Sequence, residues 1–231
     1  MCPDISSNID KDHSGKLRIT EIFYSLQGES RSVGFPTVFI RLTGCPLRCG
    51  YCDTTYAFQG GKWLSLDEII GKVVGLHGSS HYSRHVTVTG GEPLAQKNCL
   101  ALLEQLCDAG YDVSLETSGA LDVCKVDKRV VKVMDLKTPG SGESTKNLWE
   151  NLDCLTSQDQ VKFVLCDRAD YDWAKQVLHD YKLSECCEIL FSPVYGQLQA
   201  SDLADWILED RLAVRFQIQL HKVLWGEAQG R

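Results

Sequence analysis

The stretch Cys45-Pro46-Leu47-Arg48-Cys49-Gly50-Tyr51-Cys52-Asp53-Thr54 holds three cysteines, separated by three residues and then by two. Thiolates are soft ligands that bind iron–sulfur clusters, and a short loop of this kind can wrap around one cluster. Three thiolates on a four-iron cluster leave one iron without a protein ligand, and that iron can bind a substrate or a cofactor. The spacing therefore points to chemistry at a cluster rather than to electron storage.

Zinc binding and coincidence are the two alternatives to a cluster at these cysteines. A structural zinc site normally takes four Cys or His ligands, and the nearest histidines, His77 and His81, lie about 25 positions after Cys52 without a matching paired spacing. Coincidence is an alternative because the chain contains 11 cysteines. We expect a cluster, with zinc and coincidence left open at this point.

A second motif, Gly90-Gly91-Glu92-Pro93, follows about 40 residues after the cysteine loop. Together with the aromatic Tyr51 before the third cysteine, the two motifs resemble the signature of the radical S-adenosylmethionine (SAM) superfamily. The resemblance implies that the open iron binds the amino and carboxylate groups of SAM. Cleavage of SAM by an electron from the cluster would then give a 5′-deoxyadenosyl radical that abstracts hydrogen from a substrate.

Size and composition are those of an ordinary globular protein. Of the 231 residues, 43% are hydrophobic and 24% are charged. We expect one core domain over residues 17–231, preceded by a mobile polar tail over residues 1–16. The net charge of −7 argues against nucleic-acid binding. No apolar run reaches the roughly 18 residues of a membrane span, and the polar start is unlike a signal peptide, so the expected location is the cytoplasm.

The remaining cysteines do not suggest a disulfide framework of the secreted kind. The chain's total of 11 cysteines is odd and includes the adjacent pair Cys186-Cys187. In a reducing compartment each cysteine is interpreted individually. Cys99 and Cys107 lie in an apolar helical pattern, and Cys166 ends an apolar run, so we expect these three in the core.

Short apolar runs, expected as strands, alternate with helical patterns along the chain, which predicts parallel βαβ units. Seven or eight strands in this length are too few, and the helices too short, for a complete eight-fold barrel of typically about 250 residues. The predicted fold is α/β, an incomplete parallel β/α barrel. The expected strands cover residues 17–25, 37–44, 85–89, 111–115, 130–136, 160–166, 187–191 and 214–220, and the expected helices cover residues 65–76, 94–109, 169–181 and 201–209.

Polar or charged residues recur where the expected strands end, and in such a barrel these ends share the face that carries active sites. Arg41 interrupts an apolar strand just before the cysteine loop and needs an anionic partner, because an unpaired buried charge is expensive. Glu29 follows a glycine at the mouth of a strand, where loop residues often touch ligand, although a solvated turn explains it equally well. The other strand-end residues are Thr89, Glu116, Lys137, Ser192 and His221.

The superfamily resemblance implies a set of cofactor residues. Cys45, Cys49 and Cys52 would ligate the [4Fe-4S] cluster, with Tyr51 and Asp53 beside SAM. Gly91 and Glu92 would hold the SAM amino group, which suits glycine backbone and a carboxylate acceptor. Glu116 and Lys137 would lie near its polar groups or ribose, with Asp135 and Leu136 in the same site. A salt bridge at the barrel mouth is the alternative for Glu116 and Lys137.

A closer resemblance extends over nearly the whole chain. The stretches Tyr24-Ser25-Leu26-Gln27-Gly28-Glu29, Phe39-Ile40-Arg41-Leu42, Cys52-Asp53-Thr54 and Gln219-Leu220-His221-Lys222-Val223-Leu224-Trp225 are similar to the 7-carboxy-7-deazaguanine synthase family. That family contracts the ring of 6-carboxy-5,6,7,8-tetrahydropterin, with loss of ammonia, on the route to deazapurines such as queuosine. The resemblance also implies a homodimer and an electron donor such as flavodoxin.

The resemblance assigns the substrate side of the site as well. Leu26, Gln27, Gly28 and Glu29 would contact the pterin-like substrate, and Arg41 and Thr89 would bind its polar groups. Thr54 would ligate Mg²⁺, an oxygen-seeking ion that often takes few protein ligands plus substrate oxygens. The family often has glycine after Gln-Gly-Glu, whereas this chain has Ser30. The alternative functions are an activating enzyme of a glycyl-radical enzyme and a non-enzymatic iron–sulfur or zinc protein.

Overall fold

The structure, a computed structural model, describes residues 13–78 and 84–231 of the chain. Most of the expected N-terminal tail, and His81, therefore lie outside the described residues. The first strand begins at Lys16, one residue before the expected start of the core domain. Within the described residues, no helix is both long enough and apolar enough to cross a membrane.

The described strands form one sheet in the order β3-β1-β2-β4-β5-β6-β7-β8-β9. From β2 to β9 every neighbouring pair is parallel, and no pairing between β3 and β9 is found in the described part of the chain, so the barrel stays open. The strands are β1 (Lys16–Leu26), β2 (Pro36–Leu42), β3 (Lys62–Ser65), β4 (His85–Gly90), β5 (Asp112–Thr117), β6 (Val131–Asp135), β7 (Gln160–Leu165), β8 (Glu188–Pro193) and β9 (Arg215–Phe216). The incomplete parallel β/α barrel is confirmed over this region.

The first strand departs from the purely parallel prediction. β1 runs antiparallel to both β2 and β3. The reason is the connection to β2, residues 27–35, because a parallel crossover needs a dozen or more residues and usually a helix. The edge strand β3 has only four residues, too few for an apolar alternation to stand out in the sequence.

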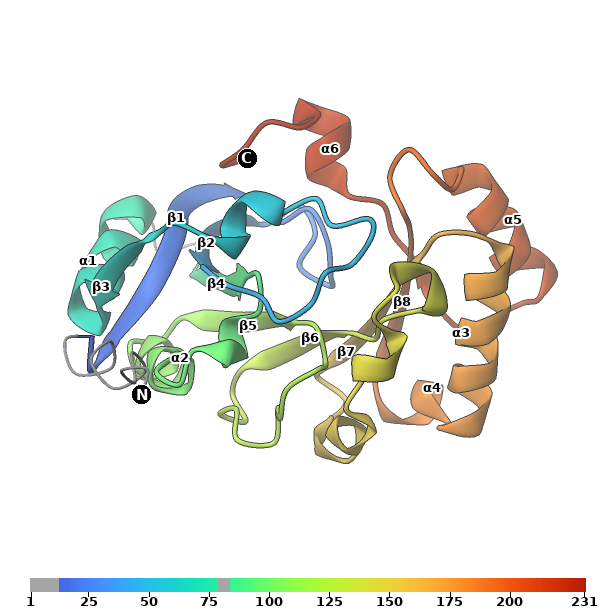
Figure 1. Cartoon of the computed structure of the whole chain (residues 1–231), viewed down its shortest axis with the longest axis horizontal. Helices are drawn as coiled ribbons and strands as arrows, with labels where there is room; N and C mark the ends of the chain where they lie inside the picture. Colours follow the sequence, from blue (N-terminus) through green and yellow to red (C-terminus); the bar gives the residue numbers. More distant parts are fainter. Residues whose placement is uncertain (1–12, 79–83) are drawn as a thin grey trace, which may run out of the picture.

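Helices cover the outer side of the sheet. In Figure 1, α1 lies beside β1 and β3 at one end of the molecule, and α3, α4 and α5 lie beside β7 and β8 at the other end. The helices are α1 (Leu66–His77), α2 (Cys99–Asp108), α3 (Arg168–Asp180), α4 (Leu183–Cys186), α5 (Ala200–Glu209) and α6 (Leu220–Trp225). The capping box predicted for α1 is present, because Ser65 and Glu68 bond to each other's backbone N–H.

Two predicted elements are shorter than expected. The helix expected over residues 94–109 begins only at Cys99, after the short 3₁₀ turn η3 (Pro93–Ala95). The Gln96 side-chain amide bonds to the backbone of Arg18 and Thr43 and so anchors that turn to the sheet. The strand expected over residues 214–220 is reduced to β9, because Leu220 instead starts α6 and donates its N–H to the Gly28 carbonyl.

The core between sheet and helices contains the cysteines predicted there. Cys99, Cys107 and Cys166 are 0%, 8% and 5% exposed and have free thiols. Cys99 and Cys107 belong to the same buried cluster as large apolar side chains such as Ile40, Leu115 and Phe163. Burial of these side chains is the main favourable contribution to folding.

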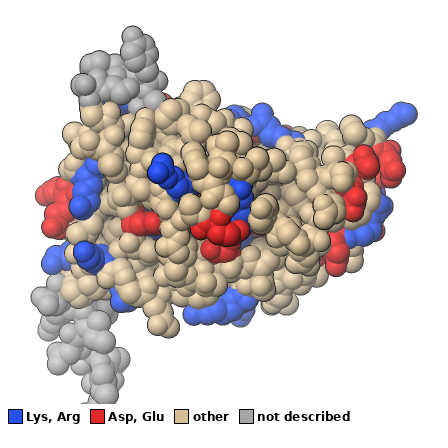
Figure 2. Space-filling view, turned by 90° about the horizontal axis from the view of Figure 1, so that it is seen from above, with Lys and Arg blue, Asp and Glu red and all other residues tan. Residues whose placement is uncertain are grey.

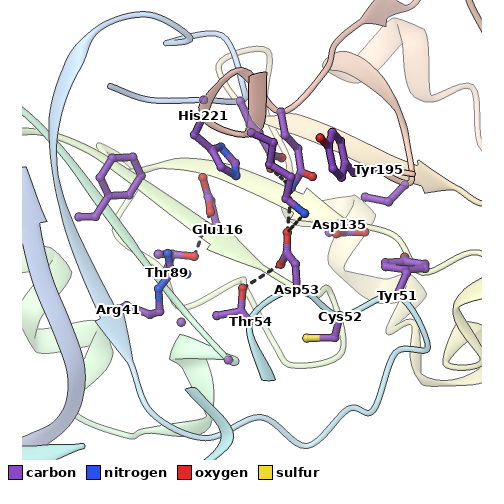
Figure 3. Close-up of a pocket in the computed structure, with 18 of the residues that line it drawn as sticks. Arg41, Tyr51, Cys52, Asp53, Thr54, Thr89, Glu116, Asp135, Tyr195 and His221 are labelled. Atoms are coloured by element: carbon purple, nitrogen blue, oxygen red, sulfur yellow. Dashed lines mark hydrogen bonds and ion pairs between the residues drawn. The ribbon is translucent and has the colours of Figure 1, made fainter. Parts of the chain in front are cut away.

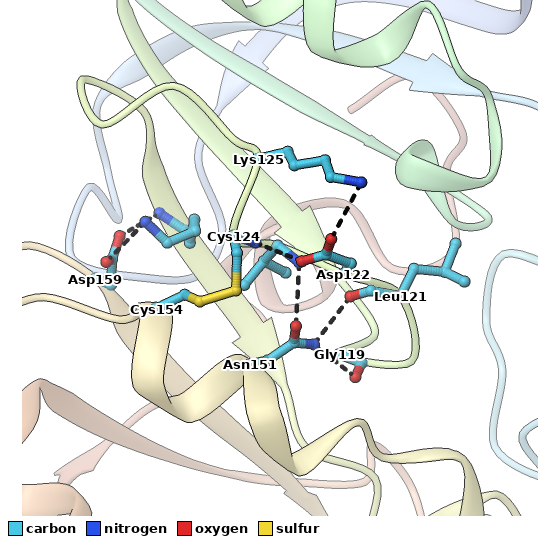
Figure 4. Close-up of a disulfide and its surroundings, with 10 residues drawn as sticks. Gly119, Leu121, Asp122, Cys124, Lys125, Asn151, Cys154 and Asp159 are labelled. Atoms are coloured by element: carbon cyan, nitrogen blue, oxygen red, sulfur yellow. Dashed lines mark hydrogen bonds and ion pairs between the residues drawn. A yellow bond between two sulfur atoms is a disulfide. The ribbon is translucent and has the colours of Figure 1, made fainter.

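A disulfide joins Cys124 to Cys154, a pairing that the sequence did not suggest (Figure 4). Their Cα atoms are 5.2 Å apart, within the usual range for a bridge. Cys124 belongs to the β5–β6 connection, which forms no helix, and Cys154 ends the 3₁₀ helix η6 (Trp149–Cys154). Beside the bridge, the Asn151 side chain accepts from Val123 N–H and donates to the Gly119 and Leu121 carbonyls. The bridge and the amide together hold the coil of the β5–β6 connection against the 3₁₀ helix η6.

We expect Cys154→Ser to lower the free energy of unfolding by about 3 to 4 kcal/mol, because the bridge closes a loop with a sequence separation of 30 residues. Chemical denaturation under non-reducing conditions measures the loss. Cys124→Ser and the double variant should show the same loss, since each removes the same bond, and dithiothreitol should erase the difference from wild type. Losses that add up in the double variant would mean that the bridge is not formed in solution.

Candidate active site

A cavity of about 560 Å³ opens at the carboxyl ends of the parallel strands. Its lining comes from the cysteine loop, the β1–β2 connection, the ends of β2, β4, β5, β6, β7 and β8, and the segment around α6. In the view of Figure 3, Arg41, Thr89 and Glu116 lie on one side of the cavity, and Tyr51, Cys52 and Asp135 lie on the other. The strand-end residues therefore gather at one mouth, as the fold prediction required.

All three loop cysteines line this cavity, are partly exposed and carry free thiols. Backbone bonds shape the loop, since Cys52 N–H donates to the Cys49 carbonyl at 3.2 Å and Leu47 N–H donates to Cys45 Sγ at 3.4 Å. Burial raises the pKa of the Cys45 and Cys49 thiols, so a positively charged centre is needed to hold them as thiolates. Three free thiols on one loop, open to one cavity, have the donor type that an iron–sulfur cluster requires.

The described residues provide no further ligands for a zinc ion at the cysteine loop. His77 packs its ring on Tyr111, with centroids 5.2 Å apart, and meets Tyr24 edge-on. In the part of the chain that the structure describes, no group of three or more His, Cys, Asp or Glu side chains, the loop cysteines included, is arranged around a single metal ion such as zinc. The His77 side chain is thus part of an aromatic cluster away from the cysteine loop.

The glycine motif packs directly against the cysteine loop. A Cβ atom on Gly91 would lie 2.8 Å from Cys45 Cβ and would overlap the Gly44 carbonyl. The next residue, Glu92, donates its N–H to that same Gly44 carbonyl at 2.8 Å. Only glycine lets the two backbones approach so closely, so the motif fixes the position of the first cluster cysteine.

Two of the expected cofactor residues are not brought to the cavity. Glu92 is 0% exposed, and its carboxylate accepts from Leu94 N–H, from the Thr117 hydroxyl and from both the N–H and the hydroxyl of Ser118, at 2.6 to 3.0 Å. Leu136 is also 0% exposed and lies in the apolar core. The carboxylate of Glu92 therefore anchors the turn after β4 to the end of β5, where Ser118 does line the cavity.

The other cofactor residues do line the cavity, namely Tyr51, Asp53, Gly91, Glu116, Asp135 and Lys137. Lys137 Nζ lies 2.9 Å from Asp135 Oδ2 and 5.9 Å from the centre of the Tyr51 ring. Lys137 is therefore already paired within the site, as the salt-bridge alternative expected, while it still faces the cavity.

The expected substrate residues Leu26, Gln27, Gly28, Glu29, Arg41 and Thr89 all line the cavity as well. Glu116 joins them, because it accepts from the Thr89 hydroxyl at 2.9 Å and from the Gln27 amide at 3.3 Å. Burial, and next the negative charge of Glu29, raise the pKa of Glu116. The site thus contains a carboxyl group that is more readily protonated than usual.

Lys162 is a site residue that the sequence interpretation did not single out. It lies in β7, and its Nζ pairs with Glu29 at 2.8 Å and with Asp135 at 3.7 Å. Burial alone would raise the pKa of Glu29, but the Lys162 ammonium lowers it below its usual value. Lys162 is a single charged residue inside the apolar run of residues 160–166. Arg41 was identified from the same pattern, so this pattern would also have identified Lys162.

The segment around α6 connects two loops of the site. Gln219 Nε2 donates to Glu29 Oε1 at 2.9 Å and to Asp53 Oδ2 at 3.1 Å, and Lys222 Nζ lies 3.1 Å from the same Asp53 oxygen. Burial opposes ionisation of Asp53, but Lys222 and then Gln219 hold its pKa well below the usual range. The other Asp53 oxygen accepts from the Thr54 hydroxyl at 2.8 Å. Contacts between such distant segments leave no local signal in the sequence.

The three-cysteine loop and the glycine motif on an open β/α barrel define a radical SAM protein, and a family model described as the radical SAM superfamily matches residues 39–136. A crystal structure of QueE from Escherichia coli has the same fold, with a TM-score of 0.71 at 24% identity, covering 89% of this chain and 95% of that one. Two curated proteins named 7-carboxy-7-deazaguanine synthase are more similar in sequence. The one from Chlorobaculum tepidum is 44% identical over 93% of this chain and 97% of its own length, and the one from Koribacter versatilis is 44% identical over 90% and 97%.

The chain therefore belongs to the 7-carboxy-7-deazaguanine synthase family of radical SAM enzymes. Membership implies a [4Fe-4S] cluster and SAM, which the thiols and the cavity described above can accommodate. The charge pattern agrees with a small-molecule enzyme. On the face drawn in Figure 2, Lys and Arg side chains are interspersed with Asp and Glu side chains and form no basic stripe.

Proposed function

We propose that the protein converts 6-carboxy-5,6,7,8-tetrahydropterin to 7-carboxy-7-deazaguanine, contracting the ring with loss of ammonia, as a step of queuosine or deazapurine biosynthesis. The observation that carries the proposal is that Arg41 and the three loop cysteines line one cavity. An arginine fork suits a carboxylate, so an anionic substrate and the cluster can meet there. The names of the relatives, 44% identical over most of the chain, support the same reaction.

Bound together, the cluster and SAM supply the 5′-deoxyadenosyl radical that abstracts a substrate hydrogen. The chain itself binds and orients the reactants and excludes water. We assign the cluster to Cys45, Cys49 and Cys52. We assign SAM to cavity-lining residues of the cysteine loop, of the glycine motif and at the ends of β5 and β6, which are Tyr51, Asp53, Gly91, Ser118, Asp135 and Lys137.

The substrate side of the cavity offers both donors and acceptors for a pterin ring. Gln27, Glu29 and Glu116 present amide and carboxyl groups, and Lys162 balances the charge of Glu29. Gly28 has room only for hydrogen, because a Cβ atom there would overlap the His221 ring. His221 therefore closes over the loop of residues 26–29, and we assign this loop to the flat substrate ring.

Mg²⁺ is part of the proposal. Thr54 lines the cavity, and its hydroxyl donates to Asp53, which leaves its oxygen lone pairs available to a cation. Hydroxyl and carboxylate oxygens are the hard donors that Mg²⁺ prefers, with the remaining positions filled by water and substrate. The donor set fits the ion, and we assign Thr54 as its protein ligand.

We expect Thr54→Val to raise the Mg²⁺ concentration for half-maximal activity by about tenfold or more, because it removes a ligand without changing shape. Cluster content and SAM binding should not change. Titrating activity with Mg²⁺ in anaerobic assays measures the effect, and Thr55→Val, at a neighbouring cavity residue, is the matched control. An identical Mg²⁺ response in the two variants would remove Thr54 from the metal site.

Three further parts of the proposal concern partners and location. The family resemblance of the sequence implies a homodimer, a reductant such as flavodoxin for the cluster, and a cytoplasmic location, and we include all three in the proposal. The same fold could instead serve an activating enzyme that acts on a partner protein. The paired charges around Arg41, Lys162 and Glu29 favour a small anionic substrate over a protein segment.

Equilibrium binding separates these two functions. The cluster-loaded protein with SAM should bind 6-carboxy-5,6,7,8-tetrahydropterin stoichiometrically in an anaerobic titration. An activating enzyme would leave the pterin unbound, and that result would overturn the proposed substrate while keeping the superfamily assignment.

A further inference from the structure

Behind Arg41 lies an acidic residue that does not touch the cavity. Glu21 of β1 stands opposite Arg41 of β2 in the sheet register. Its Oε1 atom lies 2.7 Å from Arg41 Nε and also accepts from the Tyr56 hydroxyl at 2.8 Å. Arg41 and Tyr56 line the cavity, whereas Glu21 does not. One oxygen therefore ties together two groups that do face the ligand space.

The contact with Glu21 determines how the guanidinium is presented. A guanidinium has five N–H donors in a rigid plane. The bond that the structure shows within the described residues uses Nε, the donor nearest the side-chain stem. The two terminal nitrogens lie in the same plane at the end of the side chain, and they remain for a ligand in the cavity. A carboxylate can accept from these two nitrogens side by side.

Tyr56 connects this pair to the cysteine loop. It lies in the 3₁₀ helix η2 (Thr55–Phe58), which starts directly after Thr54. Its hydroxyl donates to Glu21 Oε1 at 2.8 Å. The Arg41 guanidinium carbon also lies 5.9 Å from the centres of both the Phe23 and the Tyr56 rings. Aromatic rings and Glu21 thus hold the guanidinium from several directions.

We propose that Glu21 and Tyr56 are positioning residues that aim the terminal nitrogens of Arg41 at the substrate carboxylate and so set the preference for a carboxylated pterin. This inference rests on the proposed function. It extends that function by assigning a role in specificity to Glu21, which does not line the cavity, and to Tyr56, which does. The competing role for Glu21 is purely structural, in which it only strengthens the β1–β2 pairing.

Two fluorescent ligands separate these roles, pterin-6-carboxylate and pterin, which differ by the carboxylate alone. Fluorescence titration of the cluster-loaded full chain gives a dissociation constant for each, and their ratio is the carboxylate preference. Glu21→Ala should reduce the preference by about tenfold, the size of one hydrogen bond to a charged group, while the affinity for pterin stays unchanged. Glu21→Gln keeps the acceptor oxygen and should restore most of the preference.

Glu188 offers a matched control. It pairs with the Nε atoms of Arg31 and Arg215, its side chain is 25% exposed against 22% for Glu21, and it does not line the cavity. Glu188→Ala should therefore keep the wild-type preference. A full preference in Glu21→Ala, or an equal loss of affinity for both ligands, would overturn the positioning role. A wild type without any preference would also overturn it. Failure of the proposed reaction is visible separately, as absence of turnover by the wild type.

Discussion

Cys49→Ala should bind no intact [4Fe-4S] cluster and show no measurable turnover. Cys49 is the central of the three thiols that line the cavity. With only two protein thiolates left, the loop can no longer hold the cluster at the mouth of the barrel. Iron and sulfide analysis after anaerobic reconstitution measures the first effect, and formation of 5′-deoxyadenosine from SAM measures the second. We expect the loss of activity to exceed that of any single substitution outside the three loop cysteines.

Cys107→Ala is the control for this experiment. Cys107 is a free cysteine that is 8% exposed in α2 and does not line the cavity. That variant should keep wild-type iron content and turnover. If Cys49→Ala retained turnover, the cysteine loop would not be the cluster site and the assignment of the cavity would be wrong.

Glu92→Ala should lower the free energy of unfolding by about 3 to 5 kcal/mol, because it leaves several buried donors of Leu94, Thr117 and Ser118 without an acceptor. For a chain of this size the melting temperature should fall by roughly 10 °C. Thermal unfolding of the cluster-free protein measures the effect without involving SAM. Cluster-loaded protein should also bind SAM more weakly, since Ser118 loses its anchor.

Glu92→Gln distinguishes an anchor from a direct SAM ligand. The amide keeps one acceptor oxygen for the Ser118 and Thr117 donors, so an anchoring role predicts a clearly smaller stability loss than in Glu92→Ala and a correspondingly small change in SAM affinity. A direct contact with the SAM ammonium predicts the opposite pattern, normal unfolding with poor SAM binding. That pattern would show that Glu92 turns toward the cavity when SAM binds.

Sequence patterns located most of the parallel strands well, because these are short apolar runs that end at a polar residue, whereas β9 has only two residues of the strand expected over residues 214–220. The expected strand over residues 160–166 corresponds to Gln160–Leu165, and the one over residues 85–89 to His85–Gly90. The direction of a strand relative to its neighbour is not visible in this pattern. Apolar periodicity is the same for parallel and antiparallel pairing, so the reversal at β1 had to come from the length of its connection to β2.

The site was predictable where chemistry is local and unpredictable where it depends on distant contacts. The cysteines share one loop, and Arg41 stands out inside an apolar strand, so both were found. Gln219 and Lys222 reach Asp53 from more than 160 residues away, and only the folded chain brings them together. The Cys124–Cys154 bridge likewise joins two distant segments, a coil and a short 3₁₀ helix, and neither has a periodic pattern in the sequence.

The motif that contains Glu92 was found from the sequence, but the contacts of the Glu92 side chain in the structure differ from the expected ones. The sequence places a carboxylate beside two glycines, which suits an ammonium ligand. In the structure the buried side chain instead satisfies the donors around it. A buried carboxylate without such donors would be costly, and the position of Thr117 and Ser118 at the end of β5 becomes visible only once β4 and β5 are paired.

The most direct test of the central claim is one anaerobic incubation, read by mass spectrometry. The reconstituted full chain is mixed with reductant, SAM, Mg²⁺ and 6-carboxy-5,6,7,8-tetrahydropterin, with Cys49→Ala as the blank. We predict that 7-carboxy-7-deazaguanine and 5′-deoxyadenosine appear together in the wild type and that neither appears in the blank. Formation of 5′-deoxyadenosine without the deazapurine, or of neither compound by protein with an intact cluster, would contradict the proposed reaction.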